Sequence, residues 1–393
     1  MQPQAARKPP AIEVRSRFRS LAAGAVLLAV LAGTHVQAED TPVTFAGAEP
    51  NLDVLTPQQW RQIDASVDRG LEFLAGQQRP DGSFQAPRGG QPGITSLCIM
   101  AFLSRGHVPG GGRYGDELER AIDFVLSVQH PNGLLSIEPR GSYSIGRPSY
   151  NHAISGLMLG EVYGMTSGDL EIRVKQGILR ALKFTRELQT RPKRMKAERG
   201  GWRYVVSSGR NDSDLTATCW HLMFYRSAMN AGFEIPDQFV DEATEYVRRC
   251  YTPSMRDFVY TIDGEEGHYA SGATVAGGII ALSMAGEHGT DMARKAGSWI
   301  LESPFDRYNR RPHPFDRYHY SAYYCSQAMF QLGGEYWERF YPELQQTLLD
   351  NQNRDGSWNA EAHRDERFGN IYTTALTVLA LTPPHQLLPI YQR

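Results

Sequence analysis

Gln352-Asn353-Arg354-Asp355-Gly356-Ser357-Trp358 is the stretch that decides the fold, because a close copy of it stands near the other end of the chain. That copy reads Gln78-Arg79-Pro80-Asp81-Gly82-Ser83-Phe84. Each copy places a tight Gly turn and an aromatic residue after a glutamine. An amphipathic run precedes each copy and a more apolar run follows it. A unit that recurs in this way predicts a repeat architecture.

Six copies of the unit can be aligned within residues 56–381, although copies four and five are degenerate. The first half of each copy, as in residues 120–125, mixes charged and apolar residues at helical spacing. This pattern predicts a helix with one face in water. The second half, as in residues 273–282, is apolar nearly all round, which predicts a helix buried on every side.

The repeats predict an all-α domain in which six helical hairpins form a single (α/α)6 toroid. An open solenoid needs polar caps at its two ends. Copies one and six resemble the internal copies, so a closed double ring is favoured over an open one. Residues 39–55 and 382–393 show no periodicity, and they are interpreted as a linker and a tail.

The first 38 residues have the pattern of a secretory signal peptide. Arg15, Arg17 and Arg19 precede an uncharged run over residues 21–33, and Val36-Gln37-Ala38 places small residues at the expected cleavage site. We expect cleavage after Ala38 and export to a periplasm or the outside of the cell. A retained membrane anchor is the alternative, but the apolar run is short for a span. No other segment predicts a membrane span.

The overall composition argues against several classes of partner and cofactor. The 393 residues include 41 Lys and Arg against 43 Asp and Glu, so the composition does not predict a nucleic-acid partner. The four cysteines form no Cys-x-x-Cys pair, and three lie in apolar helical runs, which favours buried thiols over a zinc site. We therefore predict neither a metal site nor a cofactor, and the sequence does not indicate a protein partner.

The repeat pattern resembles the QW repeats of squalene–hopene cyclases. More broadly, it is similar to the α/α-toroid group that includes protein prenyltransferase β subunits, and the similarity covers most of residues 56–381. In that family the glutamine packs around the turn aromatic and ties one hairpin to the next inner helix. The resemblance assigns this role to Gln78 with Phe84, to Gln189 with Trp202 and to Gln352 with Trp358.

The residues at the starts of the apolar helices are the candidates for a central ligand site. They combine hydroxyl groups, imidazoles and aromatic rings, and apolar walls with a few polar groups are typical of small-molecule sites. The predicted ligand-binding residues are Tyr150, His152, His268, Tyr269, His319, Tyr320, Tyr323, Tyr324 and Tyr372. The alternative interpretation is that the histidines are satisfied core residues and that the tyrosines pack between neighbouring helices.

Asn211-Asp212-Ser213-Asp214-Leu215-Thr216-Ala217 resembles the Asp-x-Asp-Asp-Thr-Ala motif of squalene–hopene cyclases. Asp212 matches the first aspartate of that motif. Asp214 matches the middle one, which in the family protonates a terminal alkene, and Leu215 replaces the third. The resemblance implies that Asp212 and Asp214 are catalytic. The alternative is that an acidic residue here only caps the following helix.

Three functions remain open from the sequence. The first is an exported repeat protein whose central cavity binds an apolar or mixed small molecule, with catalysis left undecided. The second is a terpene-cyclase-like enzyme that uses Asp212 and Asp214 as its acid. The third, by analogy with other α/α toroids, is a secreted polysaccharide lyase or glycosidase. In it the carboxylate pair and Arg147, Arg210 or Arg317 would engage a sugar acid.

Overall fold

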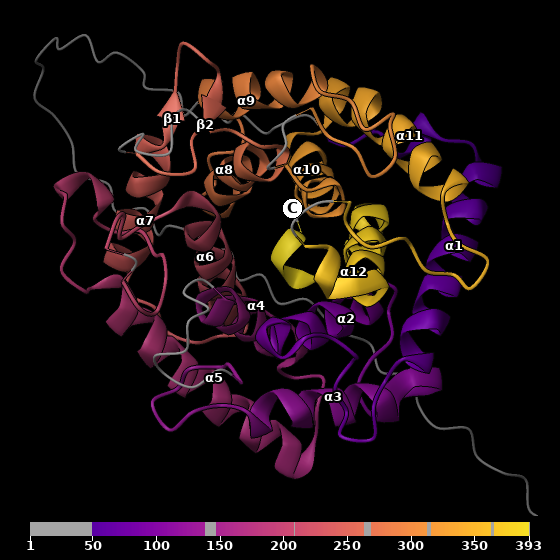
Figure 1. Ribbon diagram of the computed structural model, residues 1–393, viewed down its shortest axis with the longest axis horizontal. Coiled ribbons are helices and arrows are strands. Elements are labelled where there is room, and N and C mark those ends of the chain that lie inside the picture. The colour runs from indigo at the N-terminus through magenta and orange to yellow at the C-terminus, as the bar shows by residue number, and fades with distance from the viewer. Residues whose placement is uncertain are drawn as a thin grey trace, which may run out of the picture. The chain divides into compact units, whose positions relative to one another are not determined.

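The structure is a computed structural model that describes residues 49–137, 147–207, 209–262, 269–312, 316–362 and 365–392. In these residues, twelve α-helices alternate between an outer and an inner ring, as Figure 1 shows. The expected signal peptide (1–38) and most of the expected linker lie outside the described residues. Helices are almost the only regular secondary structure in the described residues, as the repeats predict.

The outer ring consists of the amphipathic helices, namely α1 (Pro57–Gly76), α3 (Gly115–Ser127), α5 (Gly168–Gln189), α7 (Asp237–Arg249), α9 (Asp291–Leu301) and α11 (Gly334–Asp350). The inner ring consists of the apolar helices, namely α2 (Gly93–Leu103), α4 (Arg147–Val162), α6 (Leu215–Asn230), α8 (Gly272–Met284), α10 (Tyr318–Leu332) and α12 (Gly369–Leu381). Each inner helix packs against the next, and α12 packs against α2. The ring is therefore closed, and the predicted (α/α)6 toroid is confirmed.

Short elements connect the helices. They are the 3-10 turns η1 (Leu52–Val54), η2 (Arg88–Gly90), η3 (Gly112–Tyr114), η4 (Lys196–Glu198), η5 (Glu366–Phe368), η6 (Pro383–His385) and η7 (Pro389–Tyr391), with the strands β1 (Tyr251–Thr252) and β2 (Asp257–Phe258). The two strands form an antiparallel hairpin in the fourth repeat. This hairpin stands where repeats one, two, three and six have the Gln and the Gly turn, which explains why the sequence of the fourth copy is degenerate.

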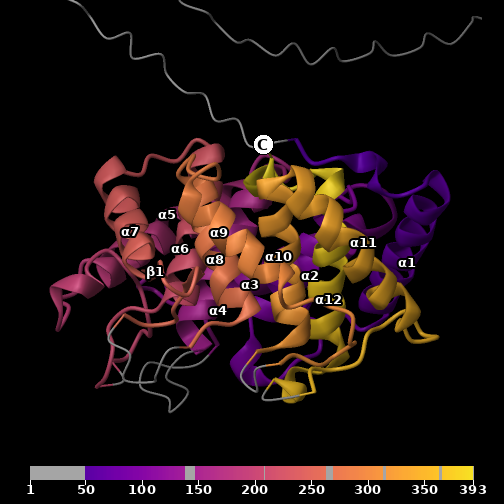
Figure 2. The same ribbon diagram turned by 90° about the horizontal axis from the view of Figure 1, so that it is seen from above.

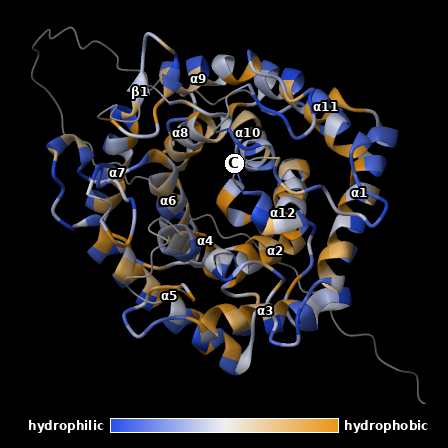
Figure 3. Ribbon diagram, in the orientation of Figure 1, coloured by the Kyte–Doolittle hydropathy of each residue, from blue (hydrophilic) through white to orange (hydrophobic). Residues whose placement is uncertain are grey.

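Hydropathy follows the two rings, with polar residues mostly on the outer helices (Figure 3). Small residues let the buried inner helices approach their neighbours closely. A Cβ on Gly156 of α4 would lie 2.6 Å from the ring of Phe224 on α6, and a Cβ on Gly278 of α8 would lie 2.5 Å from the ring of Phe258. Gly156 and Gly278 are therefore required by packing, in spite of their cost within a helix.

A glutamine joint connects successive hairpins. The amide of Gln78 donates to the carbonyl of Gly82 in its own turn (3.1 Å) and to that of Glu117 on α3 (2.7 Å). The same two bonds recur from Gln129 to Gly133 and Gly177, from Gln189 to Gly200 and Phe239, and from Gln352 to Gly356 and Ser66. The glutamine therefore bonds to the outer helix of the next hairpin, rather than to the next inner helix as the resemblance implied.

The joint from the sixth repeat to the first closes the ring. The amide of Gln352 donates to the carbonyl of Ser66 on α1 (2.9 Å), and its oxygen accepts from the guanidinium of Arg69. The turn glycine, Gly356, has a φ of +90°, and a Cβ there would lie 2.4 Å from the carbonyl oxygen of Arg69. Trp358 is fully buried and donates from its indole to the carbonyl of Leu348 (2.7 Å).

The C-terminal segment, which the sequence suggested was a tail, packs at one end of the inner ring (Figure 2). The amide of Gln331 donates to the carbonyl of Tyr391 (2.8 Å), and the hydroxyl groups of Tyr391 and Tyr323 are hydrogen-bonded. The backbone N–H of Ile390 donates to the buried carboxyl group of Glu161 (3.2 Å). The segment therefore packs against one end of the inner ring.

None of the helices in the described part of the chain combines the length and the apolar character that a membrane span needs.

Candidate functional site

The inner helices begin at the end of the ring opposite the C-terminal segment (Figure 2). We call this the open end. Most side chains of the inner helices are fully buried, but several aromatic residues at or near the helix starts keep part of their surface accessible. They are Tyr150, Tyr260, Tyr269, Tyr320 and Phe368. The sequence placed three of them, Tyr150, Tyr269 and Tyr320, in the site. The open end therefore carries a group of partly exposed aromatic residues, which we call the aromatic rim.

Asp214 is completely buried and is the N-cap of α6. Its Oδ1 accepts hydrogen bonds from the N–H of Ala217 (2.7 Å) and from the hydroxyl groups of Thr216 (3.1 Å) and Tyr150 (3.4 Å). The capping role is therefore present. The bond from Tyr150 also connects this carboxyl group to the accessible aromatic rim, which a cap alone does not require.

Arg203 is the charged neighbour of Asp214, with its Nε 3.8 Å from Oδ2, and both side chains are buried. The guanidinium lies over the rings of Tyr204 (4.8 Å) and Tyr260 (5.5 Å). Burial raises the pKa of Asp214 above its ordinary value, while the charge of Arg203 and the hydrogen bonds to the carboxyl group oppose that rise. The result is a raised pKa in an aromatic setting.

Arg203 was not predicted from the sequence, although a signal existed. It directly follows Trp202, the turn aromatic of the third repeat, and the backbone there pairs with the start of α6. The N–H of Asp214 donates to the carbonyl of Trp202 (2.9 Å). A residue next to a turn aromatic is therefore held beside the start of an inner helix.

Asp212 has a different environment from Asp214. Its Oδ2 accepts from the N–H of Arg194 (2.9 Å), and its own N–H donates to a carboxyl oxygen of Glu198 (2.8 Å). These contacts hold the loop before α6. The structure therefore does not unite Asp212 and Asp214 in one acidic pair, and a catalytic role for Asp212 has no geometric support.

His152 and His319 are fully buried. The Nδ1 of His152 accepts from the N–H of Leu135 (3.2 Å), and Nδ1 of His319 pairs with the hydroxyl of Thr377 (2.9 Å). Burial lowers the pKa of each imidazole to about 3, so both are neutral near pH 7. Their positions favour the core interpretation. His268 lies outside the described residues.

Tyr323 and Tyr324 lie further along α10 from its start than Tyr320 does, and both are buried. The ring of Tyr323 stacks on Trp220 (centroids 5.8 Å apart), and Tyr324 meets the same indole edge-on (5.4 Å). The indole N–H of Trp220 donates to the hydroxyl of Tyr320 (2.8 Å). Tyr323 and Tyr324 therefore fill the ring between the C-terminal segment and the rim, and Tyr320 connects this aromatic packing to the open end.

A second group of charges lies at the start of α10. Arg317 forms an ion pair with Asp365. The hydroxyl groups of Tyr372, Tyr320 and Tyr269 lie near its guanidinium. Tyr372, predicted for the site, is almost fully buried beside this pair. The open end thus carries two arginine–aspartate pairs among tyrosines, a mixture of charge and aromatic surface.

Glu361 was not predicted from the sequence, and it holds the start of α10. Its buried carboxyl group accepts from the N–H groups of Tyr318 (2.9 Å), His319 (2.8 Å) and Tyr320 (3.1 Å). Burial raises its pKa to about 7. Glu361 comes from the loop before α12, so no local pattern at the start of α10 indicates it. It positions Tyr320 at the rim.

The described residues contain no group of three or more His, Cys, Asp or Glu side chains that could hold a metal ion. The four cysteines are free and buried, and burial raises the pKa of Cys219 and Cys250 to about 12. Thiols with pKa values this high are unreactive, and their burial agrees with the core thiols that the apolar runs predicted.

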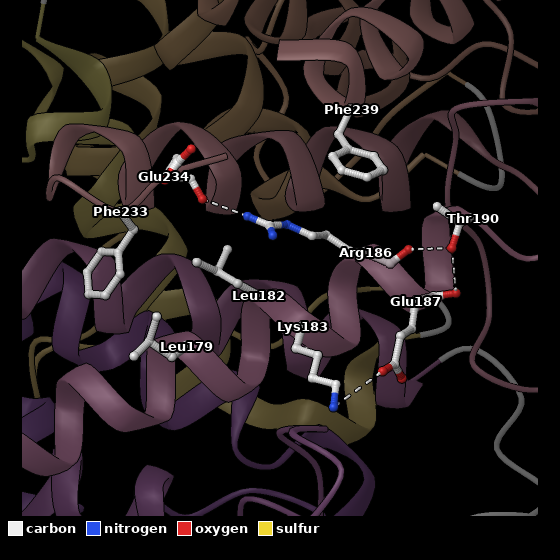
Figure 4. A pocket seen from close by; sticks show the side chains of 9 residues that line it. All are labelled: Leu179, Leu182, Lys183, Arg186, Glu187, Thr190, Phe233, Glu234 and Phe239. Atoms are coloured by element: carbon white, nitrogen blue, oxygen red, sulfur yellow. Dashed lines mark hydrogen bonds and ion pairs between the residues drawn. The ribbon is translucent and has the colours of Figure 1, made fainter. Parts of the chain in front are cut away.

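A separate pocket of about 410 Å³ lies on the outer wall, between α5 and the segment that follows α6 (Figure 4). Arg186 crosses it, donating to the carbonyl of Glu234 (2.6 Å) with its guanidinium 5.8 Å from the ring centre of Phe239. None of the predicted ligand-binding residues lines this pocket. It is therefore distinct from the open end.

No family model and no curated protein matches this chain. Solved structures do match. Type II terpene cyclase MstE from Scytonema superposes with a TM-score of 0.53 at 16% identity, over 84% of this chain and 100% of that one. An α-1,6-mannanase, GH76A of Salegentibacter sp. HEL1_6, gives 0.56 at 10% identity, over 83% and 99%.

Cellobiose 2-epimerase from Spirochaeta thermophila also gives a TM-score of 0.56, at 11% identity, over 84% of this chain and 98% of that one. The fold is therefore an α/α toroid, as the QW-like repeats indicated. Identities this low establish the fold alone, and the same architecture serves isoprenoid and sugar chemistry.

Proposed function

We propose that this protein is an exported toroid that binds an apolar or mixed small ligand at its open end. The observation that carries the proposal is the aromatic rim, in which Tyr150, Tyr260 and Tyr320 stay accessible above a ring of buried apolar helices. We expect a ligand to enter at the open end, because the C-terminal segment packs against the other end of the inner ring.

The chemistry of the rim fits a ligand with an apolar body and a polar end. Aromatic faces bind apolar groups, while Arg203 and Arg317 with their carboxylate partners provide polar contacts. One structural neighbour, terpene cyclase MstE, is in complex with its substrate geranylgeranyl dihydroxybenzoate, which has both characters. An isoprenoid with a polar head is therefore the ligand class that we favour over a polysaccharide.

A second candidate function is acid catalysis by Asp214 on such a ligand. A protonated Asp214 would give its proton to an alkene carbon, which leaves a carboxylate and a carbocation, and tyrosine faces stabilise cations. The raised pKa of Asp214 and its bond to Tyr150 support this chemistry. Arg203 opposes it, because a nearby positive charge favours the ionised carboxylate. We therefore propose binding first and catalysis second.

A pair of tyrosines at opposite ends of α4 allows a matched test. Tyr150 belongs to the rim, whereas Tyr163 directly follows the other end of the helix and contacts Phe233. Binding of geranylgeranyl dihydroxybenzoate would be measured by isothermal titration, with mannotriose as the sugar probe. We expect polyene binding that weakens at least about tenfold in Tyr150→Ala, the loss of one aromatic contact, and stays unchanged in Tyr163→Ala.

Binding of the sugar without the polyene would overturn the isoprenoid assignment, and equal losses in both variants would remove the open end from the site. Catalysis is tested separately with Asp214→Asn. This variant keeps an N-cap, so it should still bind the polyene. Product formation by the unaltered protein that Asp214→Asn abolishes would establish the acid. Absence of any product would leave a binding protein.

A further inference from the structure

The loop between α5 and α6 concentrates positive charge in a chain that is nearly neutral overall. Residues 191–207 and 209–212, which we call the basic loop, contain only two acidic residues, Glu198 and Asp212. They contain seven basic ones, which are Arg191, Lys193, Arg194, Lys196, Arg199, Arg203 and Arg210. The whole chain has 41 basic and 43 acidic residues, and this average conceals the local cluster.

The basic loop is held in a defined shape by its two acidic residues. Asp212 accepts from the N–H of Arg194 (2.9 Å) and donates its own N–H to Glu198 (2.8 Å). The hydroxyl of Ser213 donates to the carbonyl of Glu198 (2.7 Å), and Arg249 of α7 donates to the carbonyl of Arg199 (2.6 Å). The loop is therefore a fixed part of the surface.

Three cations of the basic loop carry uncompensated charge. The side chains of Lys196, Arg199 and Arg210 are exposed, and none forms a hydrogen bond or an ion pair with another described residue. Two apolar side chains are exposed in the same loop, Met195 (37%) and Val206 (45%). Exposed apolar residues among free cations are typical of protein surfaces that bind anionic lipid, where the cations meet phosphates and the apolar groups enter the headgroup boundary.

The position of the loop connects it with the site. Its last residue is Asp212, two positions before the N-cap Asp214, and the N–H of Asp214 pairs with the carbonyl of Trp202 within the loop. Arg203 of the same loop faces Asp214. The basic loop therefore borders the open end of the ring (Figure 2).

We propose that the basic loop docks this protein on an anionic lipid surface, with the open end beside the bilayer. Lys196, Arg199 and Arg210 bind the phosphate groups of the lipids, and Met195 and Val206 enter between the headgroups. An acidic polysaccharide could bind the same charges, but it has no apolar phase that would take up the exposed side chains of Met195 and Val206. Transfer of an apolar ligand from the bilayer to the rim rests on the proposed function, whereas docking does not.

Vesicle flotation with the chain from Glu39 onward tests the docking in the absence of any ligand. We expect binding to vesicles that contain 30% phosphatidylglycerol and none to pure phosphatidylcholine. The triple variant Lys196→Gln, Arg199→Gln, Arg210→Gln should reduce partitioning by roughly 100-fold, because each cation near the membrane contributes strongly. Half-molar salt should release the unaltered protein, since it screens these charges.

A matched control removes the same number of positive charges from other parts of the surface. Arg61, Lys175 and Arg339 are exposed on outer helices, and their side chains form no hydrogen bond or ion pair with described residues. Their triple change to Gln should leave vesicle binding unaltered. A separate variant, Met195→Ser, should weaken binding with an unchanged salt dependence, because it removes apolar contact and keeps the charge.

Three results would each overturn the proposal. The first is equal loss in the two triple variants, which would mean that net charge alone drives binding. The second is binding to polygalacturonate without binding to the anionic vesicles, which would identify an acidic polysaccharide as the partner. The third is no binding to either. Failure to bind a polyene would contradict the proposed function but would not affect the docking.

Discussion

Gly356→Ala should open the joint between the sixth repeat and the first. Gly356 has a φ of +90°, and a Cβ there would lie 2.4 Å from the carbonyl oxygen of Arg69. The Cβ is attached directly to the backbone of the turn, and the carbonyl oxygen belongs to the backbone of α1. Neither can rotate away, so the turn must move away from α1. That movement stretches the bonds that the amide of Gln352 makes to Ser66 and Gly356.

The expected cost has two parts. An alanine in the left-handed region costs about 1–2 kcal/mol. Losing the two hydrogen bonds of Gln352 costs about 1 kcal/mol each. The free energy of unfolding, measured by urea titration, should therefore fall by about 3–4 kcal/mol in Gly356→Ala.

Gly232 provides the matched control. Its φ is +85°, but a Cβ there has no atom within 4 Å. Gly232→Ala should therefore cost only the backbone term of about 1–2 kcal/mol. The difference between the two variants measures the close contact with Arg69. Equal losses of stability would refute the argument that the turn glycine is required by the joint.

Three further predictions concern ionisable groups. Asp214→Ala should lose about 0.5–2 kcal/mol of stability while Asp214→Asn loses little, because Asn also caps helices; thermal melting compares them. The pKa of Asp214 is raised by folding, so its stabilising effect is present at low pH and declines as the pH rises, and Asp214→Asn should flatten that slope. His152 and His319 have pKa values lowered to about 3. Their neutral imidazoles therefore stabilise the fold above about pH 6.5, and this contribution is lost as the pH falls toward 3. NMR should show no titration of either ring between pH 5 and 8. Glu361, with its pKa raised to about 7, should lose stabilisation as the pH rises from 4.5 through 7, and Glu361→Gln should remove that part of the pH dependence of the melting temperature.

The repeat pattern is sufficient to predict the fold, because each helical period and each Gly turn is a local property of the chain. Gln352 and Gly356 indicate a joint from the sequence alone, although the partner of the joint cannot be found from them. The glutamine bonds to an outer helix about 40 to 50 residues further on, as Gln78 does to Glu117 and Gln189 to Phe239, and no local pattern marks the accepting carbonyls.

The site is harder to predict for the same reason. The sequence places Tyr150, Tyr320 and Asp214 correctly near the starts of inner helices. It does not separate a rim tyrosine from Tyr323, which packs against Trp220, because the two differ in depth along the ring. Arg203 and Glu361 reach the site from loops, so helical periodicity gives no information about them.

Ring closure has a consequence for the order in which the chain folds. Within the chain, glutamine joints connect residues 39, 48 and 50 positions apart, whereas the bond from Gln352 to Ser66 spans 286 positions. For an unfolded chain, closing the longer loop costs roughly 1.6 kcal/mol more in entropy than closing one of 48 residues. We therefore expect neighbouring hairpins to assemble first, and the last hairpin to meet the first only when the rest of the ring has formed. Until that moment, the chain is an open arc whose two end hairpins expose the surfaces that later join.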